Sequence, residues 1–178
     1  GFEAGGHNGR EETTTLCLIP AVREATTLPL IAAGGIGTGE AIFATMALGA
    51  EGDQIGTRFA LTDESSASDI FKEYCLRLNE GDTKLLLKKL APTRLVTNSF
   101  RDKVEVAEAR GASAEELREL LGRGRAKKGI FEGDLEEGEL EIGQVAALFR
   151  RRQSVDEVMK ELLEGYRRAS DKVSSFLL

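Results

Sequence analysis

Two short apolar runs, each ending in a glycine turn, restrict the folds open to this chain more than any other feature. Residues 28–41 read LPLIAAGGIGTGEA and residues 52–60 read GDQIGTRFA. A run that is apolar on both faces and bounded by proline and glycine is typical of a buried parallel strand. Thr38 can cap the helix that follows the first run, and Gly49 can end that helix. Strand, helix and strand at this spacing predict a β/α unit with a right-handed crossover.

The two glycine turns are candidates for binding a phosphate. Because they end consecutive strands, they are expected side by side at one edge of a parallel sheet, where backbone N–H groups attract anions. In a β/α barrel the loops after the last two strands form such a site. The dinucleotide fingerprint G-x-G-x-x-G is absent, since counting from Gly35 it would end on Glu40 and counting from Gly37 on Ile42. A turn with a purely structural role remains the alternative for either turn taken alone.

The first nine residues, GFEAGGHNG, contain His7, the only histidine of the chain. His7 follows a flexible turn just before the two glycine turns, which predicts a position on the same loop face. An imidazole titrates near neutral pH and suits proton transfer. Thr57 can add a hydroxyl to the second turn, and Gln54 can point its amide toward a cofactor ring. A lone histidine is more often a packed or surface residue, but this context favours chemistry.

Composition and charge exclude several classes of protein. The chain has 178 residues, 41% of them hydrophobic, which is enough for one domain or one and a half. Its net charge of −6 argues against nucleic-acid partners and a membrane-binding basic face. No apolar run approaches the roughly 18–20 residues that span a bilayer. One histidine and scattered carboxylates predict no metal site, and Cys17 and Cys75 are expected as buried thiols in a reducing cytoplasm.

The character of the chain changes after residue 63. Residues 1–63 predict the α/β part, with a second strand and its turn over residues 54–59. Residues 64–178 predict mainly helices. Capping-box patterns occur at Ser113 with Glu116, and at Ser154 with Glu157 before a long terminal helix. The further expectations are helices over 64–80, 99–110 and 144–149, helix or strand over 83–90, and an acidic surface loop over 131–143.

The motifs EAGGH, AAGGI and QIGTRF, in this order and spacing, resemble the nitronate monooxygenases, formerly called 2-nitropropane dioxygenases. They are equally similar to the related flavin-dependent enoyl-acyl-carrier-protein reductases. The likeness continues through Gly122–Gly129, Gly133-Asp134 and Gly143-Gln144-Val145-Ala146, so it covers nearly all of the chain. The resemblance implies an FMN-containing TIM (β/α)8 barrel. Residues 1–63 would be its C-terminal strands and helices, and residues 64–178 a helical extension with the substrate-covering domain and barrel-closing helices.

A complete barrel needs about 250 residues, so the resemblance also implies that roughly five strands and most of a sixth would precede Gly1. Carried over residue by residue, it makes His7 the catalytic histidine. The implied FMN-binding residues are Ala4 and Gly5 near the flavin, Gly34 and Gly35 on one side of the phosphate, and Gln54, Gly56 and Thr57 on the other.

One position departs from the family pattern. Asp53 stands in the second strand, where the family usually has an apolar residue, and this puts the local packing in doubt. Arg94 and Asn98 fall in a segment where family members carry arginine and asparagine, and no role is assigned to them.

Three functions fit these motifs. The first is oxidation of an alkyl nitronate by FMN and dioxygen, with His7 abstracting an α-proton or hydrogen-bonding the nitro oxygens. The second is NAD(P)H-dependent reduction of an enoyl thioester, with His7 orienting the thioester carbonyl. The acidic surface disfavours an acidic carrier protein as partner. The third is a non-catalytic phosphate-binding or nucleotide-binding barrel. The sequence does not decide whether NAD(P)H is the electron donor or whether the protein forms a homodimer.

Overall fold

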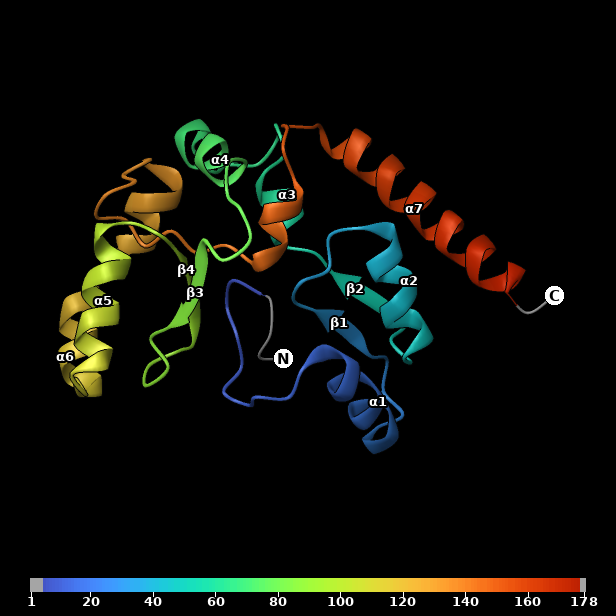
Figure 1. The fold of residues 1–178 in the computed structure, drawn as a ribbon, viewed down its shortest axis with the longest axis horizontal. Helices are drawn as coiled ribbons and strands as arrows, with labels where there is room; N and C mark the ends of the chain where they lie inside the picture. Colours follow the sequence, from blue (N-terminus) through green and yellow to red (C-terminus); the bar gives the residue numbers. More distant parts are fainter. Residues whose placement is uncertain (1–4, 177–178) are drawn as a thin grey trace.

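The computed structural model describes residues 5–176 and has a mixed α/β fold (Figure 1). Its first part contains two parallel strands, β1 (Ile31–Ala33) and β2 (Gly52–Gln54), paired in a register that sets Ala33 opposite Gln54. Helix α1 (Thr15–Ala25) precedes β1, and helix α2 (Gly39–Ala47) connects the two strands. The predicted strand–helix–strand unit is therefore present, and Thr38 caps α2 as expected by accepting from the N–H of Ala41.

The second strand lies earlier than predicted. The sequence suggested residues 54–59, whereas β2 ends at Gln54 and helix α3 (Thr57–Ala60) begins almost at once. Gly56 already has helical angles, with φ −88° and ψ −64°, so the chain turns away from the sheet there. The apolar residues after this point pack as a helical turn rather than as strand.

The second part of the molecule combines helices with an antiparallel strand pair. In chain order its elements are α4 (Asp69–Cys75), β3 (Thr83–Leu86), β4 (Thr93–Val96), α5 (Ser99–Ala109), α6 (Ala114–Leu121), a π-helical turn (Lys127–Phe131), a 3-10 helix (Gln144–Leu148) and α7 (Val155–Ser175). Both capping boxes are confirmed at the starts of α6 and α7. Within residues 5–176, no helix is both long and apolar enough to cross a membrane.

Several helical predictions for this part need correction. The helix expected over 64–80 is limited to α4, and the one expected over 144–149 is a 3-10 helix. Residues 83–90, open between helix and strand, form β3 and a following turn. All four residues of β4 are buried, because this strand has neighbours along both edges. Such pairing depends on distant segments and leaves no helical or strand period to read locally.

Helix α7 packs against α2, and Figure 1 shows the two side by side. The approach is close because both helices present a glycine: a Cβ on Gly39 would lie 2.1 Å from the carbonyl oxygen of Leu162. A Cβ on Gly165 would lie 2.9 Å from the Glu40 carboxylate. The rings of Phe43 and Tyr166 meet edge to face at 5.6 Å. The terminal helix α7 therefore packs closely against the β/α unit through α2.

Buried apolar side chains form three clusters, one inside the β/α unit, one around α4 and the C-terminal segments, and one between the β3–β4 pair and helices α5 and α6. Cys75 belongs to the second cluster, and burial raises the pKa of its thiol to about 12. The prediction for Cys17 was wrong, since its side chain is exposed. Helix α1 buries fully only Ile19, and Cys17 lies on its solvent side.

Candidate functional site

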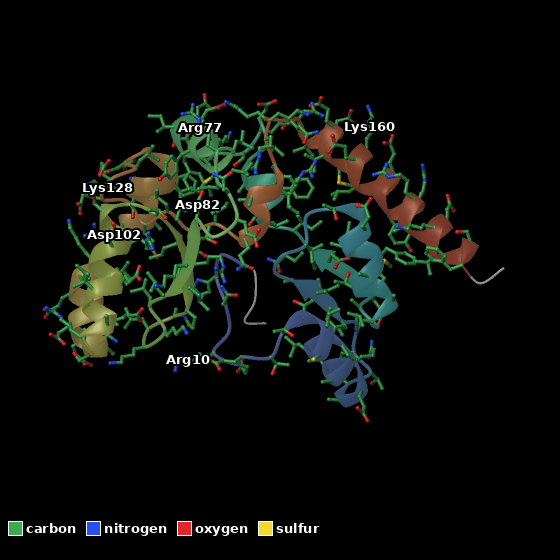
Figure 2. The ribbon with its side chains drawn as sticks, viewed as in Figure 1. Arg10, Arg77, Asp82, Asp102, Lys128 and Lys160 are labelled. Carbon is green, nitrogen blue, oxygen red and sulfur yellow. The ribbon has the colours of Figure 1, made fainter. Side chains whose placement is uncertain are left out.

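A cavity of about 490 Å³ lies at the carboxyl ends of β1 and β2, where it is also walled by the N-terminal segment and by residues 141–145. This volume is within the range of small-molecule sites. Seven of the eight site residues predicted from sequence line it: Gly5, His7, Gly34, Gly35, Gln54, Gly56 and Thr57. Ala4, the eighth, lies outside the described residues. The charged side chains that Figure 2 labels, such as Arg77, Asp102 and Lys160, lie on the outer surface instead.

The turn after β1 favours glycine because of its backbone angles. Gly34 and Gly35 have φ angles of +99° and +73°, a region that other residues rarely adopt. A Cβ on Gly34 would also lie 3.5 Å from the backbone nitrogen of Gly5. The backbone of Gly5 therefore runs directly against this turn, and Gly5, Gly34 and Gly35 present only backbone to the cavity.

The turn after β2 is open toward the cavity. A Cβ added to Gly56 would meet no atom within 4 Å, so bare backbone faces free space at this position. Gln54 at the end of β2 is exposed and lines the cavity. The hydroxyl oxygen of Thr57 accepts a hydrogen bond from the N–H of Gly143 at 3.0 Å, which leaves the hydroxyl hydrogen available to a ligand.

His7 reaches the cavity because its backbone is held along β4. It forms an isolated antiparallel bridge with Thr93. On either side, the N–H of Arg94 donates to the carbonyl of Gly6 at 2.7 Å, and the N–H of Asn8 donates to that of Pro92 at 2.9 Å. The Asn8 side-chain amide closes the turn by donating to the carbonyl of Gly5 at 2.7 Å. The imidazole itself remains 67% exposed on the cavity wall.

A carboxylate that the sequence did not single out faces this histidine. Glu141 also lines the cavity, and its Oε1 lies 3.6 Å from Nδ1 of His7. Burial raises the pKa of Glu141, while the charge of His7 lowers it. Burial likewise raises the pKa of Glu139, and the Glu141 charge adds to that rise. The site thus combines one imidazole with the carboxyl group of Glu141, and Glu139 lies behind it, outside the cavity lining.

The expectation of a surface loop over residues 131–143 therefore fails at its end. Leu140 and Ile142 are buried, and Glu141 between them bridges Leu95 of β4. The alternation of polar and apolar residues in Glu139–Ile142 is a signal for an extended segment, and it could have located Glu141 on the opposite face from its neighbours.

The structure shows the surroundings of three residues that the sequence left unexplained: Asp53, Arg94 and Asn98. Asp53 accepts a hydrogen bond from the Thr45 hydroxyl at 2.6 Å, and burial raises the pKa of its carboxyl. The packing around Asp53 is therefore polar, between β2 and α2. Asn98 caps α5 and donates to the carbonyls of Leu135 and Gly138 at 3.0 and 2.8 Å. Arg94 is buried in β4 and donates to Thr83, so neither Arg94 nor Asn98 lines the cavity.

Fold and cavity together define an α/β protein with a ligand-sized site at the carboxyl edge of a parallel strand pair. The family model described as nitronate monooxygenase matches residues 1–165. The chain belongs to the nitronate monooxygenase family.

Relatives and solved structures agree with this assignment. A probable nitronate monooxygenase of Staphylococcus saprophyticus is 38% identical over 116 residues, covering 58% of this chain and 32% of the relative. FabK from Thermotoga maritima superposes with a TM-score of 0.89 at 33% identity, covering 99% of this chain and 55% of that one. A nitroalkane oxidase from Streptomyces ansochromogenes superposes at 0.73 with 30% identity, covering 97% and 52%. The chain thus spans about a third of the curated relative and about half of each solved neighbour.

Proposed function

We propose that the protein containing this chain is an FMN-dependent oxidoreductase that oxidises alkyl nitronates with dioxygen. The observation that carries the proposal is the convergence of the predicted histidine and the two glycine turns on one cavity. In this proposal residues 1–63 form the C-terminal part of an FMN-binding TIM barrel, and residues 64–178 form a helical extension that includes the substrate-covering domain and the barrel-closing helices. The nitronate monooxygenase family membership supports the reaction class.

The residues present fit FMN. Gly56 offers backbone next to open space, so a phosphate oxygen can approach its amide without meeting a side chain. Gly34 and Gly35 form the facing turn, and the Thr57 hydroxyl adds a donor. Gly5 lies against Gly34 and would add backbone to the same binding surface. When bound, FMN supplies the electron acceptor for the substrate and the site that reacts with dioxygen.

The chain's own side chains have binding and proton-handling roles in this proposal. His7 hydrogen-bonds the nitro oxygens of a nitronate, or takes the α-proton where a neutral nitroalkane is the substrate. The amide of Gln54 faces the cavity and can hydrogen-bond the cofactor ring. Ile130, Ile142 and Val145 provide an apolar wall that limits water near the reacting atoms.

A second candidate is FMN-dependent, NAD(P)H-driven reduction of an enoyl thioester. It would use the same glycine turns to bind FMN, with His7 orienting the thioester carbonyl. One observation favours it: Glu141 places a carboxylate on the cavity wall, which repels an anionic nitronate but not a neutral thioester. The close superposition on FabK is compatible with this candidate.

An absorbance spectrum of the purified protein, followed by anaerobic addition of propionate 3-nitronate or NADH, tests both candidates. Bleaching of a flavin spectrum by nitronate, with recovery on admission of oxygen, is expected. Bleaching by NADH and reoxidation by crotonyl thioester would instead support the reductase. A Gly56→Val variant should lose FMN while keeping its unfolding transition, because the added side chain enters open space. A colourless protein that takes up no added FMN contradicts both candidates.

A further inference from the structure

We infer that Glu141 is a positioning residue for His7: its carboxylate accepts the Nδ1 hydrogen, so that the Nε2 lone pair faces the cavity. The inference concerns a residue that the sequence motifs did not single out. The role of the resulting pair in turnover rests on the proposed function, whereas the hydrogen bond itself does not.

The two residues are brought together by one edge of β4. His7 bridges Thr93, and Glu141 bridges Leu95, two residues further along the same strand. Positions two apart on a strand share a face, so residues paired with them along one edge also point to a common face. Here that face lines the cavity, where both side chains are found. The contact therefore follows from backbone pairing rather than from a chance surface approach.

Backbone hydrogen bonds hold each partner in this register. On the His7 side, the N–H of Arg94 donates to the carbonyl of Gly6 at 2.7 Å. On the Glu141 side, the N–H of Val96 donates to the carbonyl of Leu140 at 3.0 Å, and the N–H of Ile142 donates to that of Arg94 at 3.3 Å. Arg94 thus bonds both segments through its own backbone, which restricts how far His7 and Glu141 can separate.

Gly6 makes room for the glutamate side chain. A Cβ at Gly6 would lie 3.1 Å from Cγ and 3.2 Å from Oε1 of Glu141, so the side chain lies directly over the glycine backbone. From there Oε1 is 3.6 Å from Nδ1 of His7, an ion-pair distance slightly longer than a hydrogen bond. Catalytic hydrogen bonds of this kind commonly shorten when a ligand is bound. The inferred hydrogen bond requires the exposed imidazole to lie closer to Oε1 than in this structure, and the ring tautomer reports whether it does.

The surrounding charges single out Glu141 as the partner. From its own segment Glu139 faces it, and the charges of Arg125 and, more weakly, His7 act on the Glu139 carboxyl. From β4, the Arg94 guanidinium donates to Thr83 at 3.4 Å. Glu141 is the carboxylate that pairs with His7 within ion-pair distance among the described residues. Glu139 therefore provides a matched control, being a neighbouring carboxyl of similar burial.

Nitrogen-15 NMR of the histidine ring tests the hydrogen bond without FMN or substrate. The His7 signals are those missing from a His7→Gln variant. At about pH 9, where imidazole is neutral, the wild-type protein should show mainly the Nδ1–H tautomer. Free imidazole side chains prefer Nε2–H, so Glu141→Ala should shift the population toward that form. Glu141→Gln, which keeps the shape and a weaker acceptor, should give an intermediate ratio, and Glu139→Gln should match the wild type.

A wild-type His7 with the tautomer ratio of a free side chain overturns the inference, as does an equal change in the Glu141 and Glu139 variants. Circular dichroism shows whether a variant is folded. If Glu141→Ala unfolds, the tautomer ratio of the nearly isosteric Glu141→Gln variant tests the hydrogen bond instead. In a protein that turns over a nitroalkane, Glu141→Gln should also lower kcat/KM, whereas Glu139→Gln should leave it unchanged. Absence of turnover in the wild type overturns the proposed function and leaves the NMR result unaffected.

Discussion

The hydroxyl oxygen of Thr57 accepts a hydrogen bond at 3.0 Å from the backbone N–H of Gly143, a residue 86 positions later in the chain. This bond connects the glycine turn after β2 to the segment that carries Glu141. Gly143 is a buried residue at the cavity wall, so its N–H depends largely on this hydroxyl for a hydrogen-bond acceptor. The two walls of the cavity are therefore coupled through one side-chain oxygen.

Thr57→Val is expected to lower the free energy of unfolding by about 1–3 kcal/mol, because it leaves the buried N–H of Gly143 without an acceptor. Thr57→Ser keeps the hydroxyl and should stay much closer to the wild type. Chemical denaturation followed by circular dichroism measures both. If Thr57→Val unfolds within about 0.5 kcal/mol of the wild type, the bond does not join the two walls.

Gly39→Ala should destabilise the protein by about 1–3 kcal/mol, since the new methyl group would force α7 away from α2. A Cβ at this position would lie 2.1 Å from both the Leu162 carbonyl oxygen and the Tyr166 nitrogen. Gly56→Ala is a matched control, because its Cβ meets nothing within 4 Å and its backbone is already helical. The control should be unchanged or more stable by up to about 1 kcal/mol. Equal melting temperatures for the two variants would contradict the close helix packing.

Arg58→Met is expected to cost about 1–3 kcal/mol of stability, because it leaves the buried acceptors on Gly37 and Gln153 without their donor. The guanidinium donates to Gln153 at 2.9 Å, pairs with Glu161 and lies 4.3 Å from the Phe149 ring centre. Arg151 contacts the same Glu161 at 3.0 Å but is 65% exposed. Arg151→Ala should therefore cost less than about 1 kcal/mol. Thermal and urea unfolding of the two variants give the comparison, and similar losses would refute the role assigned to burial.

The stability of the 134–137 turn should depend on pH through Asp134. Hydrogen bonds from the backbone N–H of Glu137, from Lys128 and from the N–H of Glu136 lower the pKa of this carboxyl from 3.8 to about 2. A folded-state pKa below the unfolded one contributes stability above about pH 4, and this contribution is lost as the pH falls through about 2. The difference in unfolding free energy between the wild type and Asp134→Asn should therefore shrink between about pH 6 and pH 2.

Lys128→Met provides the second variant for this test. It removes one of the groups that lower the pKa of Asp134, so the pH-dependent loss of stability should be smaller than in the wild type and complete at a higher pH. A difference between wild type and Asp134→Asn that stays constant across the pH range would show that the carboxylate charge does not stabilise the turn.

The parts of the fold predicted correctly depend on local chemistry. Thr38, Ser113 and Ser154 cap helices where their residue types and spacing suggested. The positive φ angles of Gly34 and Gly35 match the expected glycine turn after β1. The convergence of the turns with His7 was also predictable, because consecutive parallel strands bring their carboxyl ends to one edge.

The errors fall where distant segments compete with local preference. Cys17 sits in an apolar pattern yet lies on the solvent side of α1, since only one side of that helix has a partner among the described residues. The acidic run ending at Glu141 has a loop-like composition, but backbone pairing with β4 buries both neighbours of this residue. For Cys17 the residues nearby carry no signal of exposure, whereas for Glu141 the alternation in Glu139–Ile142 indicates an extended segment but not the strand with which it pairs.

The sequence by itself determined the turns, the caps and the identity of the one histidine, because each depends on backbone angles or hydrogen bonds within a few residues. The tertiary structure decided which carboxylate faces that histidine. His7, Thr93 and Glu141 are far apart along the chain. They meet only because two segments pair, one after the other, with the edge of β4 that does not pair with β3. Strand pairing of this kind is stabilised by long-range hydrogen bonds and burial, for which no local pattern of residues is sufficient.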